Sequence, residues 1–302
     1  MKKLIILLFF ICLSKLTDAQ QDAQASMYFF NPLSYNPAYA GTRESFNITA
    51  VHRSQWLGWA GAPTTQFLSI HAPIARKKIG LGGNVSYDRI GSRTGFSAVF
   101  DFAYHLYLNN KGLKLSMGGS AGLFSNQASF SDLKANDVTD VNYQSSYSSM
   151  TSNFGAGLYL HSKNGYLGLS SPRLLDRSLD KNNGNSFSQK HYYAAAGYVF
   201  KMNSVIDLKP SLLYKYTKNG PFALDVNLSA HLYKRFWIGG MFRFNESVGF
   251  NCAYTFNDVC QLGYSFDFPY NGLRLNNWGS HELLICFDLK TKNHAFVSPR
   301  YF

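Results

Sequence analysis

The chain contains the residue types that acid–base chemistry needs, but their spacing does not bring them together. Asp101 and His105 are four residues apart, and Asp225 and His231 are six apart. Four residues of a β-strand span roughly 13 Å between Cα atoms, which is too far for a direct hydrogen bond. We therefore expect these side chains to be polar wall residues. The sequence predicts no catalytic residue and no enzyme activity.

No metal or cofactor site is indicated either. Asp132, Asp137 and Asp140 could offer carboxylates to calcium, but their spacing does not follow an EF-hand loop. The glycines at 80–83 are in phase with a strand, so they suggest close packing instead of a phosphate-binding loop. We expect no cofactor and no bound metal.

The cysteines do not form a recognisable framework. After the amino-terminal segment the chain has Cys252, Cys260 and Cys286. An odd number without CxxC spacing fits neither a zinc site nor a set of disulfides. Cys252 has the phase of an apolar strand face, which predicts a small hydrophobic residue. One disulfide among the three stays open.

The elements that carry these residues are strands with two different faces. Within 222–233 every even position is apolar, whereas Asp225, Asn227, Ser229 and His231 occupy odd positions. Successive side chains of a strand point to opposite faces, so this segment predicts one apolar and one polar face. The same alternation recurs along the chain, as expected of an outer-membrane barrel with lipid outside and a polar lumen inside.

The pattern predicts about fourteen strands, several of them near the roughly 9–11 residues that cross a bilayer when tilted. They are 46–53, 64–72, 78–88, 95–107, 112–124, 152–163, 164–171, 190–203, 205–217, 221–234, 235–246, 247–257, 259–269 and 281–290. We predict an all-β protein with a single antiparallel transmembrane β-barrel at 46–302.

Aromatic residues and connection lengths agree with that architecture. Many apolar faces carry tyrosines such as Tyr104, Tyr198 and Tyr233, which suggests aromatic girdles at the membrane interfaces. Short connections alternate with two long polar ones at 125–151 and 172–189. Barrels have short periplasmic turns, and an even strand count leaves both termini in the periplasm.

The amino terminus has the layout of an export signal. A basic start is followed by a run of ten apolar residues at 4–13 and by small residues before position 20, which predicts a signal peptide at 1–19. A periplasmic segment at 20–45 would lie against the barrel mouth or in the lumen. The formal net charge is +12, but an exported chain is not expected to bind nucleic acid. Outer-membrane lipid is the expected surrounding.

Two short motifs are more specific than the barrel pattern. The first is Asn36-Pro37-Ala38-Tyr39-Ala40-Gly41, and the second contains Arg53, Gln55 and Trp56. Three later segments also carry the resemblance named below: 169–172, 279–283 with His281 and Glu282, and 298–302. Together they resemble the PorP/SprF family of outer-membrane proteins of Bacteroidetes type IX secretion, and the resemblance spans essentially the whole mature chain.

The resemblance implies a non-enzymatic accessory barrel of the type IX secretion and gliding system. Its implied partners are adhesin-type cargo with a C-terminal sorting domain and other components of the secretion system. Its implied role is export and surface anchoring of the cargo through the cargo's C-terminal signal. The scaffold or partner-binding residues would be Asn36, Pro37, Tyr39, Gly41, Arg53, Gln55, Trp56, His281 and Glu282.

The residues themselves allow different readings of these motifs. Proline holds Asn36 in an extended conformation, and Gly41 suits a positive φ. Arg53 and Trp56 are types common at binding hot spots, but they would serve equally to pin the amino-terminal segment to the barrel. A porin stays open as an alternative, because Lys209, Lys215 and Asp207 have the lumen phase. An outer-membrane enzyme is the third reading.

Overall fold

We analysed a computed structural model of the chain. The structure describes residues 24–43, 45–74, 78–110, 112–129, 146–178, 187–188, 190–217, 220–257, 259–272 and 277–289. The proposed signal peptide, the three loop aspartates and the carboxyl terminus lie outside these ranges.

The described residues are dominated by long antiparallel strands. The first half contains β1 (Phe46–Ser54), β2 (Thr64–Ile74), β3 (Ile79–Ile90), β4 (Arg93–Tyr107), β5 (Lys114–Ala128), β6 (Tyr147–His161) and β7 (Gly165–Arg173). The second half contains β10 (His191–Tyr198), β12 (Ile206–Thr217), β13 (Ala223–Leu232), β14 (Phe236–Arg243), β15 (Ser247–Phe256), β16 (Cys260–Pro269) and β17 (Ser280–Leu289). Short pairs β8 (Arg177–Ser178) with β9 (Phe187–Ser188), and β11 (Phe200–Lys201) with β12, complete the set.

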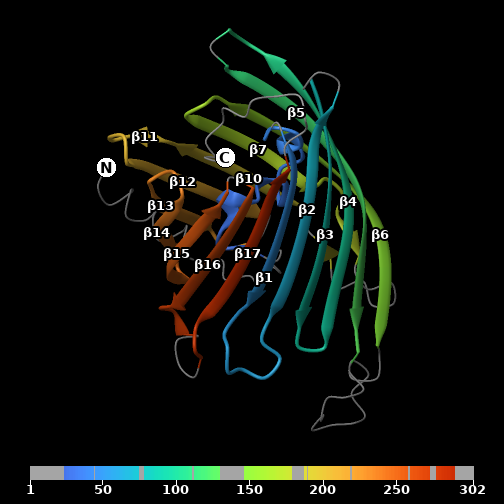
Figure 1. Ribbon diagram of the computed structural model, residues 1–302. Coiled ribbons are helices and arrows are strands. Elements are labelled where there is room, and N and C mark those ends of the chain that lie inside the picture. The colour runs from blue at the N-terminus through green and yellow to red at the C-terminus, as the bar shows by residue number, and fades with distance from the viewer. Residues whose placement is uncertain are drawn as a thin grey trace, which may run out of the picture.

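The fourteen long strands close into one barrel (Figure 1). Sequential strands pair as hairpins, β10 pairs with β7 and β12, and β1 pairs with β17 over nine residue pairs from Phe46 to Ser54. The predicted strand number is therefore confirmed. The main difference lies in 125–151, where β5 and β6 extend beyond the predicted ends because alternation continues there with serine and asparagine instead of strongly apolar residues.

The two faces of the wall differ as the alternation predicts. On β4, Phe96, Phe100 and Phe102 are exposed on the outside, whereas Asp101 and His105 are buried inside. The same holds on β13, where Leu228 is exposed and Asp225 is buried. An outer face this apolar is suited to hydrocarbon and not to water. Among the described residues, no helix is long and apolar enough to cross a bilayer.

The three cysteines do not all lie on the same face of the barrel wall. Cys252 is half-buried in the outward phase of β15, as predicted, and Cys260 is also half-buried. Cys286 is fully buried in the inward phase of β17. All three are free thiols in the structure, so none of them forms the disulfide that the sequence left open.

The two ends of the barrel differ in their connections. At one end, which we call the loop-rich rim, the connections include 55–63, 129–146, 174–190 and 270–279. At the other, the short-turn rim, the connections are 75–78, 108–113, 162–164, 199–205, 233–235 and 257–259. Strand β1 starts and strand β17 ends at the short-turn rim, so that rim is where the barrel meets its two terminal segments.

The core of the molecule is the amino-terminal segment, which lies inside the ring of strands (Figure 1). We call residues 24–43 the plug. It contains three 3₁₀ turns, η1 (Tyr28–Phe30), η2 (Pro32–Ser34) and η3 (Pro37–Tyr39). Met27, the aromatic residues of η1 and Leu33 are at most 3% exposed. The segment therefore supplies the hydrophobic core that the polar inner wall lacks.

Local sequence explains why the plug turns. Pro32 and Pro37 each begin a 3₁₀ turn, where the missing N–H costs nothing and φ is already set. Asn36 is extended, with φ −137°, and its side chain accepts a 3.0 Å hydrogen bond from the Ala38 N–H. Gly41 has a φ of 74°, the positive value that the sequence suggested.

Glycines of the inner wall make room for the plug. A Cβ added to Gly80 would clash with the Ala40 carbonyl, one on Gly118 with the backbone of Ala38, and one on Gly157 with the Asn36 side chain. These three glycines lie on β3, β5 and β6. Because glycine has no side chain, the η3 turn can approach the inner face of these strands closely. The close packing expected of the glycines at 80–83 is found at Gly80.

Replacing an inner glycine by alanine should destabilise the barrel. In Gly118→Ala the new methyl group meets plug backbone, and overpacking of this kind costs about 1–3 kcal/mol. The urea midpoint of unfolding of the refolded protein should fall accordingly. Gly119→Ala is the matched control, because its Cβ faces outward and its nearest neighbour, the Gly155 carbonyl oxygen, is 3.8 Å away. Equal midpoints for the two variants would contradict the role of Gly118.

Candidate functional site: the plugged lumen

A buried charge cluster fixes the amino-terminal end of the plug. Arg53 on β1 lies opposite Glu282 on β17 in the strand register. Its guanidinium contacts Glu282 at 3.2 Å and Asp267 of β16 at 2.8 Å, and all three side chains are at most 2% exposed. Removing one partner from such a buried cluster leaves an uncompensated charge, which costs about 3–5 kcal/mol.

The plug completes this cluster with its own backbone. Glu282 accepts hydrogen bonds from the N–H groups of Ser26 at 2.6 Å and Met27 at 2.8 Å. The Ser26 hydroxyl lies between Arg53 and Asp267 and bonds to both. Two carboxylates, one guanidinium and two backbone donors therefore satisfy one another, and the start of the plug becomes part of the seam between the first and last strands.

A second cluster fixes the other end of the plug. Arg43 pairs with Asp288 of β17 at 3.2 Å, and its Nε donates to the Tyr39 hydroxyl at 2.9 Å. Ser45 and Asn47 also donate to Asp288, at 3.1 Å and 2.8 Å. This cluster lies near the short-turn rim, whereas Arg53 lies one residue from the opposite end of β1. The plug is thus held at both ends of the lumen.

Burial sets the protonation states of the plug. Burial raises the pKa of the Tyr28, Tyr35 and Tyr39 hydroxyls, which therefore stay protonated. Burial alone would lower the pKa of Arg43, but the neighbouring Tyr39 and the Asp288 carboxylate raise it well above its usual value. Arg43 is therefore a permanent cation at the centre of its cluster.

The charged lumenal side chains that could line the channel of a porin make contacts within the protein instead. Lys215 on β12 pairs with Asp225 on β13 at 2.7 Å and donates to the Gln24 side chain at 2.5 Å. Arg243 on β14 pairs with the same Asp225 at 3.1 Å. Lys209 is fully buried between the rings of η1 and the indole of Trp237, with its Nζ 5.4 to 5.9 Å from the ring centroids. These groups do not line an open aqueous pore.

The plug runs along the barrel in a defined direction. Gln24 and Ser26 contact Lys215, Arg53 and Asp267, which lie in the loop-rich halves of their strands. Gly41 and Arg43 contact His71 and Asp288, which lie near the short-turn rim. Within the described residues, the chain therefore starts on the loop-rich side and crosses the lumen before β1 begins.

A cavity of about 120 Å³ remains between the plug and the loop-rich rim. Tyr28, Leu33 and Tyr35 of the plug form its floor. Its wall combines aromatic and polar side chains of Phe67, Phe124, Tyr193, Ser86, Ser97, Asp101, Ser120, Arg173 and Lys215. Most of these wall residues belong to the loop-rich halves of their strands, so the cavity lies on that side of the plug.

The structure brings together most of the motif residues from the sequence. Asn36 donates to the Leu158 carbonyl at 3.1 Å, and Tyr39 packs edge-on against His71 and Tyr159. With Pro37, Gly41, Arg53 and Glu282, these residues lie in the lumen and hold the plug. These contacts connect the plug to the inner face of the barrel wall.

The remaining motif residues lie elsewhere. Gln55 and Trp56 follow β1 at the loop-rich rim, where the Trp56 N–H donates to the Ser280 hydroxyl at 3.3 Å. His281 has the outward phase of β17 and contacts the Tyr264 hydroxyl at 2.7 Å. His281 and Glu282 are adjacent in sequence but lie on opposite faces of the wall.

The residue pairs considered for acid–base chemistry are not assembled. Asp101 accepts a 2.5 Å hydrogen bond from Asn84, whereas His105 contacts the Ser116 hydroxyl at 2.7 Å. Asp225 is taken up by Lys215 and Arg243, and His231 stacks on Trp237 with ring centroids 4.1 Å apart. These contacts fit the wall role expected of all four residues.

Sequence reasoning missed several residues that hold the plug. The sequence predicts the lumenal phase of Asp267 but not its role at the plug, and it predicts no plug contact for Ser26, Arg43, Asp288, Gly118 and Gly157. The signal that could have found them is their phase, since Asp267, Asp288, Gly118 and Gly157 all occupy inward positions of apolar strands. A charge or a glycine in the inward phase of such a strand is thus a candidate for contact with a lumenal segment.

Removing Arg53 should destabilise the folded protein strongly. In Arg53→Met, the Glu282 and Asp267 carboxylates stay buried without their cation, and the free energy of unfolding should fall by about 3–5 kcal/mol. Urea unfolding of the refolded protein in detergent measures this change. Adding Glu282→Gln should restore part of the loss, whereas exposed Arg93→Met should change stability by no more than about 0.5 kcal/mol. Equal losses for Arg53→Met and Arg93→Met would refute the cluster's role.

Comparison with solved structures shows the same barrel fold at low sequence identity. The Acinetobacter baumannii outer membrane protein Omp33 is similar with a TM-score of 0.51 and 9% identity, over 82% of this chain and 100% of that one. The Ralstonia pickettii toluene transporter TbuX has a TM-score of 0.50 and 8% identity, over 91% and 96% of the two chains. The CymD monoaromatic hydrocarbon channel has a TM-score of 0.50 and 9% identity, over 89% and 94%.

These likenesses identify the fold as a transmembrane β-barrel of the outer-membrane type and carry no function to this chain. No curated protein sequence matches the chain. The family described as type IX secretion system membrane protein PorP/SprF matches residues 17–287, which covers nearly all of the barrel and the whole plug. The chain belongs to the PorP/SprF family of type IX secretion system membrane proteins.

Proposed function

We propose that this protein supports export and surface anchoring of large adhesin-type cargo by binding the cargo's C-terminal signal at the loop-rich rim. The observation that carries the proposal is the plug, which occupies the lumen and is bound to the barrel wall at both of its ends. A barrel that is closed in this way is suited to holding a partner at its mouth and not to passing it through. Membership of a type IX secretion family supports a secreted partner.

The loop-rich rim offers an exposed aromatic surface. The connection 55–63 is joined to 270–279 by backbone hydrogen bonds from Leu57 to Gly279 at 2.9 Å and from Trp278 to Leu57 at 2.7 Å. Trp59 and Trp278 are 39% and 79% exposed on this joined surface. Tryptophan is enriched at binding hot spots. These rim tryptophans are the proposed contact surface for the cargo signal.

We propose that the two rims face opposite sides of the outer membrane. The barrel is integral to the outer membrane, with the loop-rich rim outside the cell and the short-turn rim, where β1 starts and β17 ends, in the periplasm. Other components of the secretion system would contact the protein from the periplasmic side. Gliding motility would be served through the anchored adhesin.

Loss of the rim tryptophans should reduce surface retention of the adhesin. In Trp59→Ala with Trp278→Ala, the amount of cell-surface adhesin should fall by roughly tenfold or more, as expected when hot-spot residues are removed. Surface labelling with an adhesin antibody measures the effect. Tyr233→Ala, which removes an equally exposed aromatic ring from the opposite rim, is the control. Wild-type export and anchoring of every large adhesin in a deletion strain would sink the proposal.

The porin alternative predicts a different electrical behaviour. Because the plug is anchored at both ends, the wild-type protein should show no stable conductance in planar bilayers. Removing both anchors in Arg43→Met with Arg53→Met should give intermittent channel openings. Arg89→Met with Arg93→Met, which removes two charges from the wall hairpin at 91–92, should stay silent. Steady wild-type conductance would contradict the closed lumen.

A further inference from the structure

The cavity on the loop-rich side of the plug is lined by one carboxylate, that of Asp101 on β4. This side chain is 2% exposed and accepts a 2.5 Å hydrogen bond from the Asn84 amide, which lines the same cavity. Ser120 lies directly opposite Asp101 in the strand register and is also part of the lining. A buried carboxylate, an amide and a hydroxyl therefore form one polar patch on the cavity wall.

Asp101 differs from other carboxylates that point into the lumen. Four of them each lie within 3.2 Å of a lysine or arginine nitrogen: Asp225, Asp267, Glu282 and Asp288. In the part of the chain that the structure describes, Asp101 forms no ion pair, and its hydrogen-bond partner is the neutral amide of Asn84. Burying a carboxylate without a cation is costly, and a cation placed beside it offsets that cost. Asp101 is therefore a lumenal acid that a cationic ligand would stabilise.

Aromatic rings supply the other part of a site for an organic cation. Two rings from the plug and three from the wall line the cavity: Tyr28, Tyr35, Phe67, Phe124 and Tyr193. The rings of Tyr35 and Tyr193 lie with their centroids 5.8 Å apart. The face of an aromatic ring attracts a cation, and the attraction is stronger where water is excluded. The lining thus combines a counter-ion for an ammonium group with apolar surface for its alkyl part.

The two cations that line the cavity already make contacts within the protein. Lys215 lies 2.7 Å from the Asp225 carboxylate. The Arg173 guanidinium lies over the Phe124 ring, 4.7 Å from its centroid. Among the described residues, neither of these cations forms an ion pair with Asp101. The negative charge of the cavity is therefore matched only if a cation enters from outside.

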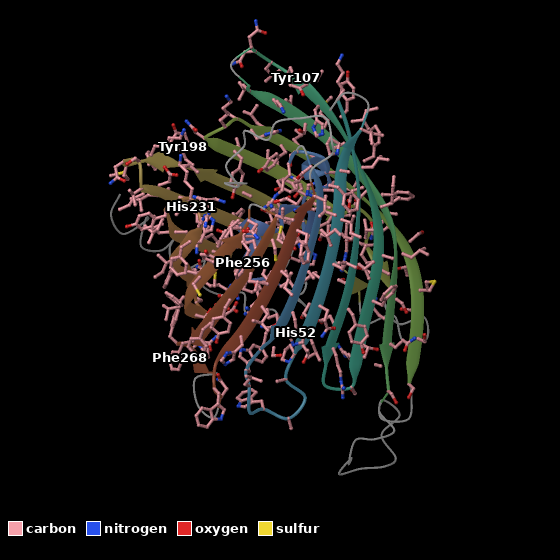
Figure 2. All side chains as sticks on the ribbon, viewed as in Figure 1. His52, Tyr107, Tyr198, His231, Phe256 and Phe268 are labelled. Carbon is pink, nitrogen blue, oxygen red and sulfur yellow. The ribbon has the colours of Figure 1, made fainter. Side chains whose placement is uncertain are left out.

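The size and position of the cavity limit the ligand. Its volume is about 120 Å³, and a cavity of about 150 Å³ holds a single benzene molecule. Ser97, also in the lining, lies four residues closer than Asp101 to the loop-rich end of β4, the end of the barrel that His52 and Phe268 mark in Figure 2. Ser97 is half-buried whereas Asp101 is buried, so exposure increases in that direction. A small ligand is therefore expected to enter from the loop-rich side.

We propose that this cavity binds an alkylammonium group, either that of a small free amine or that of a lysine side chain. The ammonium pairs with Asp101, and the alkyl stem packs against the aromatic rings. An ammonium carries several N–H donors, so the Ser120 hydroxyl oxygen can accept a second hydrogen bond. The site is separate from the rim tryptophans and does not depend on their proposed role.

Calorimetric titration of the refolded protein in neutral detergent with butylammonium chloride tests the proposal. The wild-type protein should bind butylammonium saturably and more tightly than butanol or butyrate. Asp101→Asn keeps the shape and the hydrogen bond from Asn84 but loses the charge, so the affinity should fall on the order of tenfold or more. Asp207→Asn is the matched control, because it removes an inward carboxylate that does not line the cavity, and it should keep the affinity.

Two further measurements separate binding from folding and identify the source of the ammonium. Because Asp101 has no cation to leave unpaired, Asp101→Asn should not lower the urea midpoint of unfolding. Ser97→Leu adds bulk to the cavity wall with the carboxylate in place, and it should also weaken binding. If Nα-acetyl-lysine amide binds as well as butylammonium, the site accepts a lysine side chain of a protein partner, whereas binding of butylammonium alone assigns it to free amines.

Three results would overturn the assignment. Absence of saturable butylammonium binding by the wild-type protein would leave Asp101 as a wall residue alone. Equal affinities of the wild-type protein and Asp101→Asn would show that the carboxylate does not receive the ligand. Tighter binding of butyrate than of butylammonium would assign the cavity to an anion held by Arg173 or Lys215.

Discussion

The contact between Arg53 and Glu282 joins the three parts on which the structure depends. It lies on the seam between β1 and β17, where a linear chain of strands must close into a ring. It also binds the first backbone donors of the plug, Ser26 and Met27. Closure of the barrel and occupation of the lumen by the plug therefore depend on each other, because the buried carboxylates need hydrogen-bond donors from both the guanidinium and the plug.

The plug explains why so many ionisable side chains of the lumen are buried without lining a pore. A barrel of this size with a polar inner wall would normally hold water. Here the aromatic rings of η1 and the η3 turn, which packs against the inner glycines, fill that space. The charged side chains of the wall pair with one another or with the plug. What remains among the described residues is a cavity of about 120 Å³ on the loop-rich side of the plug.

Most of the fold could be predicted from the sequence, because alternation reports strand phase directly. Fourteen strands were found this way, and the errors lie where serine and asparagine weaken the contrast, as in the extensions of β5 and β6. The lumenal site was harder. Arg53 and Glu282 are 229 residues apart, and only closure of the ring brings them together. The backbone conformations of Asn36 and Gly41 could be predicted from their local sequence. Strand phase alone, however, cannot tell which inward-facing glycines lie against a turn of the plug.

Charge distribution adds a constraint that the strand pattern does not contain. The lumenal cations Arg43, Arg53, Lys215 and Arg243 are each matched by buried carboxylates, so they contribute little to the net positive charge of the chain. Among the described residues, the excess therefore resides on the outer rims.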